Sequence, residues 1–115
     1  MKEFLMLIRE NADYGSMTAE DIQACVEKHI NWVNGLIEKG QYKLANPLDD
    51  KGASIKNGVV TDGPYIESKE CVSGFYILLA NSLEEAVGIA KTCPDVERGN
   101  TIEIRQITEV DDPTT

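Results

Sequence analysis

His29 is the only histidine of the chain, and imidazole is the side chain that normally titrates near neutral pH. It lies one helical turn from Cys25 and Val33, on the expected apolar stripe of a long helix. Two interpretations of this position are open. His29 is either a core or interface histidine with a backbone partner, or a general acid or base at the mouth of a pocket between helix and sheet. A nucleophilic role for Cys25 is disfavoured, because a thiol buried on this stripe would be inert.

A second group of ionisable side chains follows the turn at residues 62–65, where the Asp-Gly-Pro sequence is a strong turn signal. One interpretation is a solvated loop whose ion pairs are worth about 0–1 kcal/mol each. The other is a polar pocket bounded by two tyrosines, which could hold an aromatic or planar substrate. The residues of this candidate substrate site are Tyr65, Glu67, Lys69, Glu70 and Tyr76, with Asp62 beside them.

The chain offers no recognisable metal or cofactor motif. One histidine and three widely spaced cysteines do not supply the close-spaced ligands of a zinc site, and no glycine-rich phosphate loop is present. We therefore expect neither a metal nor a cofactor. A Mg²⁺ or Ca²⁺ site made of carboxylates alone stays open, although residues 49–52 lack the spacing of a calcium loop. The odd number of cysteines also argues against a disulfide framework and favours a reducing cytoplasm.

Charge and length limit the classes of partner. The net charge of −9, from 11 basic and 20 acidic residues, argues against nucleic acid and against an anionic membrane surface. No stretch approaches the roughly 18 apolar residues of a membrane span, and the first residues lack the apolar segment of a signal peptide. The length favours one domain, residues 1–110, followed by a flexible acidic tail at residues 111–115.

The apolar pattern predicts an α+β fold. Residues 4–8 and 74–80 are unbroken apolar runs typical of buried strands, and residues 101–107 begin with the alternation of a half-exposed strand. Thr18 and Ser82 are expected to cap two helices, the first of which ends at Gly40. The Asn-Gly pair at 57–58 predicts a type I′ hairpin, and residues 95–100 are expected to form a loop. This order predicts a ferredoxin-like βαββαβ domain with an additional β-hairpin, in which two helices cover one face of an antiparallel sheet.

The two unbroken apolar runs also predict a homodimer. Two helices cover only one face of such a sheet, yet both runs are apolar on both faces. A second copy of the chain, packed sheet against sheet, would cover the other face.

A longer series of residues resembles a known family. The series is Asp62-Gly63-Pro64-Tyr65, Glu67, Lys69-Glu70, Gly74-Phe75-Tyr76-Ile77-Leu78 and Ser82-Leu83-Glu84-Glu85-Ala86. It is similar to the YCII-related family, in the branch named after its D-G-P-F motif, with Tyr65 where the branch usually has phenylalanine. The resemblance implies a dimeric α+β barrel. It also implies a pairing of a helix histidine with an aspartate, in which His29 matches the first position and Asp49 the second.

Two functional hypotheses follow. The first is a small cofactor-independent enzyme that carries out an elimination or isomerisation on a small cyclic or aromatic acid. In it His29 is the base, Asp49 or Asp62 orients the imidazole, and Lys69 holds an anionic group; the family resemblance adds weight, because one YCII-type activity is a dehydrochlorination. The second is a non-catalytic small-molecule-binding or sensing module, because relatives of this branch are sometimes joined to, or encoded beside, extracytoplasmic-function sigma factors.

Overall fold

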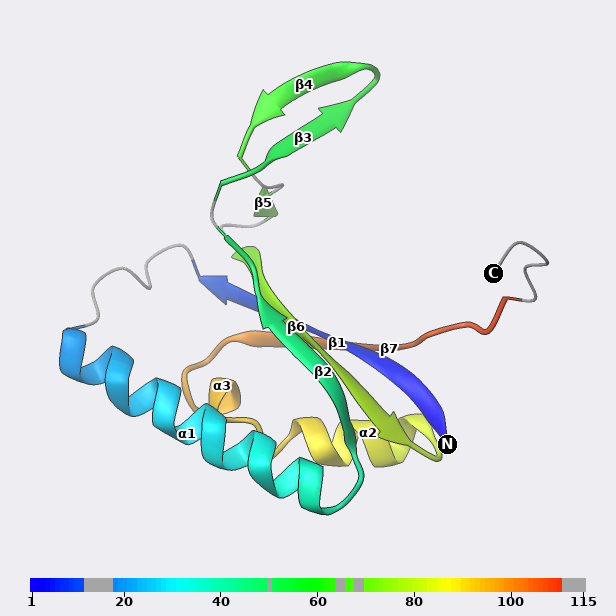
Figure 1. Ribbon diagram of the computed structural model, residues 1–115. Helices are drawn as coiled ribbons and strands as arrows, with labels where there is room; N and C mark the ends of the chain where they lie inside the picture. Colours follow the sequence, from blue (N-terminus) through cyan, green and yellow to red (C-terminus); the bar gives the residue numbers. More distant parts are fainter. Residues whose placement is uncertain (12–17, 50, 64–65, 68–69, 111–115) are drawn as a thin grey trace.

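The sheet and its helices have the predicted ferredoxin-like arrangement. The computed structural model describes residues 1–11, 18–49, 51–63, 66–67 and 70–110. Four long strands form an antiparallel sheet in the order β2-β6-β1-β7, and helices α1 and α2 lie on one of its faces (Figure 1). The elements are β1 (Lys2–Asn11), α1 (Ala19–Glu38), β2 (Tyr42–Pro47), β3 (Ala53–Lys56), β4 (Val59–Asp62), β5 (Ile66–Glu67), β6 (Glu70–Ala80), α2 (Leu83–Ala90), α3 (Pro94–Glu97) and β7 (Thr101–Gln106).

The central strands divide their side chains between two faces. Phe4, Met6 and Ile8 of β1 are buried on the helix side, where Met6 lies opposite Tyr76 of β6 and Ile104 of β7. Leu5 and Leu7 alternate with them and are only partly buried. The core therefore lies between the sheet and the helices. The opposite face carries the side chains of Leu5 and Leu7, and no described helix lies over that face (Figure 1).

Helix α1 begins and ends as its sequence predicts. The Thr18 side chain accepts a hydrogen bond from the Asp21 backbone, and the Asp21 carboxylate accepts one from the Thr18 backbone, which completes a capping box. The helix ends at Glu38, and Gly40 adopts the left-handed conformation, with φ of 69°. Leu36 is the one buried residue of α1, so most of its apolar stripe does not enter the core.

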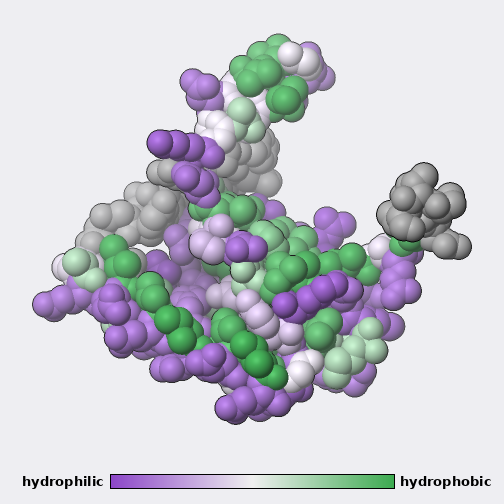
Figure 2. Space-filling model, in the orientation of Figure 1, coloured by the Kyte–Doolittle hydropathy of each residue, from purple (hydrophilic) through white to green (hydrophobic). Residues whose placement is uncertain are grey.

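The predicted hairpin projects from the end of the sheet. Strands β3 and β4 pair around Asn57 and Gly58, whose φ angles of 52° and 77° suit a type I′ turn. The hairpin extends beyond the body of the molecule, with apolar side chains on its surface (Figures 1 and 2). Gly63 follows β4 with φ of 85°, a left-handed conformation that glycine adopts without strain.

Two element predictions differ from the structure. The segment expected to be a loop at residues 95–100 begins with a short helix, α3, because Pro94 suits a first helical position and Asp95 suits a first turn. Strand β6 begins at Glu70 rather than at residue 74, because its first residues pair with β5 and with the end of β1. The predicted tail at 111–115 lies outside the described residues. None of the described helices combines the length and the hydropathy needed to cross a membrane.

Candidate functional site

A cavity of about 740 Å³ lies between α1 and the β2–β6 half of the sheet. Most of its wall is apolar, and much of that wall comes from the stripe of α1. Figure 2 shows this row of apolar side chains along α1 beside a hollow in the surface. The apolar side chains of α1 that line the cavity are Ile22, Val26, Ile30 and Val33. Most of the stripe predicted from the sequence therefore forms a cavity wall, and Leu36 near its end contacts the core.

His29 and Asp95 form an ion pair at this cavity. His29 Nε2 lies 2.7 Å from Asp95 Oδ2, and Nδ1 lies 2.8 Å from the backbone oxygen of Cys25. A carbonyl oxygen can only accept, so Nδ1 carries a hydrogen and donates it. The hydrogen bond to Asp95 raises the pKa of His29 above its usual 6.5, although burial acts in the opposite direction. Both ring nitrogens thus face acceptors, an arrangement that favours an imidazolium beside a carboxylate.

Asp95 is held in place by further donors. Its side chain is only 4% exposed. Asn100 Nδ2 lies 3.1 Å from Oδ1, Arg98 Nη1 lies 3.3 Å from the same oxygen, and Cys93 Sγ lies 3.5 Å from Oδ2. Burial acts to raise the pKa of Asp95, but hydrogen bonds and charge from His29, with further bonds from Asn100 and Cys93, hold the pKa below its usual value. The carboxylate is therefore fixed, ionised and aimed at the imidazole.

Arg98 connects Asp95 with the end of the first strand. Its Nη1 lies 3.2 Å from Glu10 Oε1, and Glu10 and Arg98 both line the cavity. Among the described residues, the ionisable groups of the cavity are thus two carboxylates, one guanidinium and one imidazole. A ligand entering this space would meet apolar walls and one concentrated polar corner.

Tyr76, on the sheet side of the cavity, is supported by Trp32 from α1. Tyr76 lines the cavity, and its ring packs edge-on against Trp32, with ring centroids 5.2 Å apart and an angle of 82° between planes. Trp32 donates its indole N–H to Thr92 Oγ1 at 2.7 Å. Burial raises the pKa of Tyr76, so its hydroxyl stays protonated at neutral pH.

Of the side chains predicted to act in catalysis, the structure places only His29 at the cavity. Asp49 does not line it, and its carboxylate accepts the backbone N–H of Lys51 at 3.0 Å. Asp62 is exposed at the end of β4, on the projecting hairpin. The carboxylate that lies against the imidazole in the structure is Asp95, not Asp49 or Asp62, whose catalytic roles stay predictions.

The predicted substrate-binding residues divide into two groups. Tyr76 lines the cavity, as a bounding tyrosine should. Tyr65 and Lys69 lie outside the described residues. Only the backbone of Glu67 and Glu70 is described, and the two residues face each other across the β5–β6 pair. The polar pocket predicted around Lys69 thus stays a prediction.

The sequence contained one signal for the residue that was missed. Pro94 followed by Asp95 is a helix-start pattern, and it could have placed a carboxylate at a helix N-terminus. Nothing in the sequence, however, indicates that this carboxylate meets an imidazole 66 residues earlier.

Three side chains could in principle share a metal ion. Ligand atoms of His29, Cys93 and Asp95 all lie within 4.8 Å of one another. Burial raises the pKa of the Cys93 thiol to about 12, and the imidazole and carboxylate are already joined by a short hydrogen bond. Metal binding would require that bond to open and the thiol to lose its proton. The groups fit a hydrogen-bonded cluster better than a metal centre.

Comparison with known proteins places the chain in a family. The model of the YCII-related domain matches residues 3–111, so the chain belongs to the YCII-related family. Among solved structures, the 5-chloro-2-hydroxyhydroquinone dehydrochlorinase of Burkholderia phenoliruptrix AC1100, in complex with 2,5-dihydroxybenzoquinone, has the same fold. It superposes with a TM-score of 0.55 and 18% sequence identity, over 94% of this chain and 95% of the other. No curated protein sequence matches.

Proposed function

We propose that this YCII-related protein is a cofactor-independent acid–base enzyme that acts on small hydroxylated rings of the hydroquinone or quinone class. The observation that carries this proposal is the 2.7 Å pair of His29 and Asp95 at the edge of an apolar cavity. A pair of this kind stores one transferable proton next to a space that fits a small ring.

The protonation state of the pair favours a general acid in the first step. Both ring nitrogens of His29 face acceptors and the pKa of His29 is raised, so the pair favours an imidazolium, whose proton passes to a ligand when one of these two hydrogen bonds opens. The imidazolium would protonate a ring carbon of a bound phenolate, which converts the ring into its keto form. The neutral imidazole would then accept a hydroxyl proton while a leaving group such as chloride departs. One residue would thus serve as acid and then as base, with Asp95 stabilising the imidazolium between the two steps.

The cavity supports the proposed class of substrate. Its volume of about 740 Å³ is within the usual range for small-molecule sites, and apolar side chains from α1 form one wall. Arg98 supplies a positive charge near the pair, which suits the partial negative charge of a phenolate oxygen. The dehydrochlorinase that shares this fold is named for a chlorinated hydroxyhydroquinone, which supports the proposal.

A kinetic experiment tests the proposal. Chlorinated hydroquinones would be incubated with the protein, and both chloride release and deuterium exchange at ring C–H positions would be followed. We expect His29→Gln and Asp95→Asn to lower the rate by about 10²–10⁴-fold, the usual contribution of a positioned acid–base group. Glu97→Gln is the matched control, because Glu97 belongs to the same short helix and forms only an exposed pair with Lys28. Equal rates in all variants would overturn the proposal.

A binding or sensing module is the second candidate. One observation favours it: both ring nitrogens of His29 already have hydrogen-bond partners within the protein. Such a module would bind hydroquinones with a change in the His29 resonances but would show neither chloride release nor ring deuterium exchange. The kinetic experiment therefore separates the two candidates.

We also propose that the protein is a homodimer formed through the uncovered face of the sheet. Leu5, Ile77 and Leu44 are neighbours across β1, β6 and β2 on that face, and all three are partly exposed. A second copy would bury them sheet against sheet. All three cysteines are free thiols, which supports a reducing cytoplasm as the compartment we propose.

A further inference from the structure

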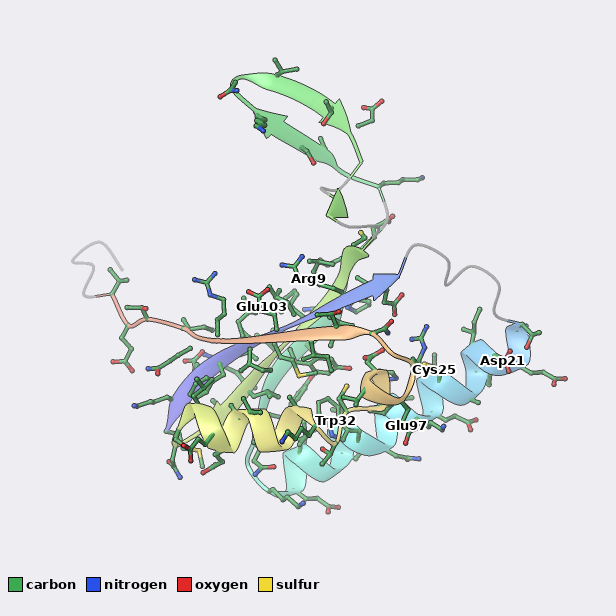
Figure 3. The ribbon with its side chains drawn as sticks, turned by 180° about the vertical axis from the view of Figure 1, so that it is seen from behind. Arg9, Asp21, Cys25, Trp32, Glu97 and Glu103 are labelled. Carbon is green, nitrogen blue, oxygen red and sulfur yellow. The ribbon has the colours of Figure 1, made fainter. Side chains whose placement is uncertain are left out.

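Cys25 places a sulfur atom in the polar corner of the cavity. Its Sγ lies 3.6 Å from His29 Nδ1 and 3.6 Å from Arg98 Nη1, and the residue lines the cavity. In Figure 3 it lies on α1 beside the short helix α3. The residue is partly exposed and lines the cavity, whereas its place on the apolar stripe predicted burial, so we infer that a molecule inside the cavity can reach it.

The other two cysteines have different surroundings. Cys93 is 2% exposed and lies against Asp95, and burial raises its pKa to about 12. Cys71 is partly exposed, like Cys25, but it lies on β6 outside the cavity, with its thiol 3.7 Å from the backbone oxygen of Val72. Cys71 is therefore a natural control for the surroundings of Cys25.

We propose that Cys25 is a covalent attachment site for conjugated carbonyl compounds, of the quinone or enone class, that enter the cavity. The arrangement supplies the two groups that this reaction needs. The sulfur is a soft nucleophile, and His29 Nδ1 and Arg98 Nη1 each lie 3.6 Å from it, so that their positive charges would stabilise the oxygen that becomes negative during the addition. The apolar walls of α1 would hold the ring against this corner.

The reaction balances without any further reagent. The sulfur forms a bond to the carbon in conjugation with the carbonyl, and the carbon–carbon π pair moves to the carbonyl oxygen. The carbonyl oxygen takes up the proton that the thiol loses. With a quinone, the ring proton then moves to the second oxygen, so that the product is a thioether of a hydroquinone. The thiol hydrogen ends on the product, and no external oxidant or reductant takes part.

This inference rests on the proposed function only for the class of ligand. Adduct formation at Cys25 requires a cavity that admits a conjugated ring, but it does not require turnover. The two ideas can therefore fail separately.

Labelling with 1,4-benzoquinone tests the inference. The whole protein would be treated briefly with one equivalent of reagent, and each cysteine peptide would be quantified by mass spectrometry. We expect Cys25 to react at least about tenfold faster than Cys71, since positioned donors accelerate such additions by this much or more. The Cys25→Ser variant should lose the fast adduct and keep the slow reaction of Cys71.

Two controls separate the cavity from simple exposure. Iodoacetamide, which has no conjugated ring, should discriminate less between Cys25 and Cys71 than benzoquinone does. Hydroquinone at high concentration should slow the benzoquinone reaction of Cys25 and leave Cys71 unchanged. The inference is overturned if Cys71 reacts with benzoquinone as fast as Cys25, or if both reagents give the same ratio. Selective labelling in a protein without turnover would contradict the proposed enzyme and leave this site intact, and turnover without labelling would do the reverse.

Discussion

At the scale of single residues, Asp95 determines the chemistry of His29. The imidazole is one-fifth exposed and has one carboxylate partner among the described residues, at 2.7 Å. Arg98 and Asn100 fix that carboxylate from its other oxygen. The only histidine of the sequence thus has a carboxylate partner in the structure.

Replacing Asp95 should return the imidazole toward ordinary behaviour. In Asp95→Asn we expect the pKa of His29 to fall, since the largest influence that raises it is lost. Titration of the ring resonances by NMR measures this shift. Glu97→Gln, on the same short helix, should leave the titration of His29 unchanged.

The same pair should make stability depend on pH in a defined window. The raised pKa of His29 means that its contribution is complete below the unfolded value of 6.5 and is lost as pH rises through the folded pKa. The lowered pKa of Asp95 means that its contribution is present above the unfolded value of 3.8 and is lost as pH falls through the folded pKa. Both partners contribute between about pH 4 and pH 6.5.

Chemical denaturation of the wild type and of Asp95→Asn across pH checks this window. We expect the difference in unfolding free energy to be largest there, at about 1–3 kcal/mol, and to shrink on both sides. A difference that is constant from pH 3 to pH 9 would mean that Asp95 acts through packing alone.

The residue scale also shows what the sequence could reveal. The position of His29 on an apolar stripe correctly indicated a place between helix and sheet. Asp95 could not be paired with it, because residues 66 positions apart meet only through the relative placement of α1 and α3. Asp49 was expected to pair with His29 only because it matches the position of the aspartate in the family resemblance.

At the scale of elements, the two halves of α1 differ in how much they contact the core. Its C-terminal half carries Leu36, the buried residue, and Trp32, which packs against the core. Its N-terminal half has no buried residue and carries only part of the cavity wall, where Ile22 and Val26 are 52% and 47% exposed. The N-terminal half therefore depends on the capping box and on the pair of His29 with Asp95.

Removing the cap should loosen only this half. In Thr18→Ala we expect a loss of about 1 kcal/mol, the usual cost of an N-cap. Hydrogen exchange should quicken at residues 22–29 and change little at residues 34–38. Uniform acceleration along the helix would contradict the division into two halves. Ser82→Ala, the equivalent change in α2, is the control that should leave α1 protected.

Elements were more predictable than their contacts. The apolar runs, the capping residues of α1 and the Asn57–Gly58 turn are local signals, and each led to the element that was expected. The boundary of β6 and the helix α3 differed, because pairing with β5 and a single turn of helix leave weak local patterns.

At the scale of the whole molecule, the sheet has one covered and one open face. Arg9 and Glu103 form an ion pair at 3.1 Å across β1 and β7 on the side away from the helices (Figure 3). Leu5 and Ile77 lie on this same open face. Such a mixture of apolar centre and charged rim is typical of a protein interface.

Charge placed at the centre of this face should prevent association. We expect the wild type to sediment as a dimer at micromolar concentration and Ile77→Lys to sediment as a monomer, because a lysine there could not be desolvated without a partner. Ile37→Lys is the control, since Ile37 is 53% exposed on the helix layer. A wild type that is monomeric at these concentrations would contradict the proposed dimer.

The central claim is that the His29–Asp95 pair holds a transferable proton where a ring-shaped ligand binds. The most direct measurement is an NMR titration of the His29 ring nitrogens, alone and with a saturating hydroquinone. We predict a pKa above 6.5 in the free protein, protons on both nitrogens at neutral pH, and a further change in both resonances on binding. A His29 that titrates at or below 6.5 and does not respond to the ligand would contradict the account.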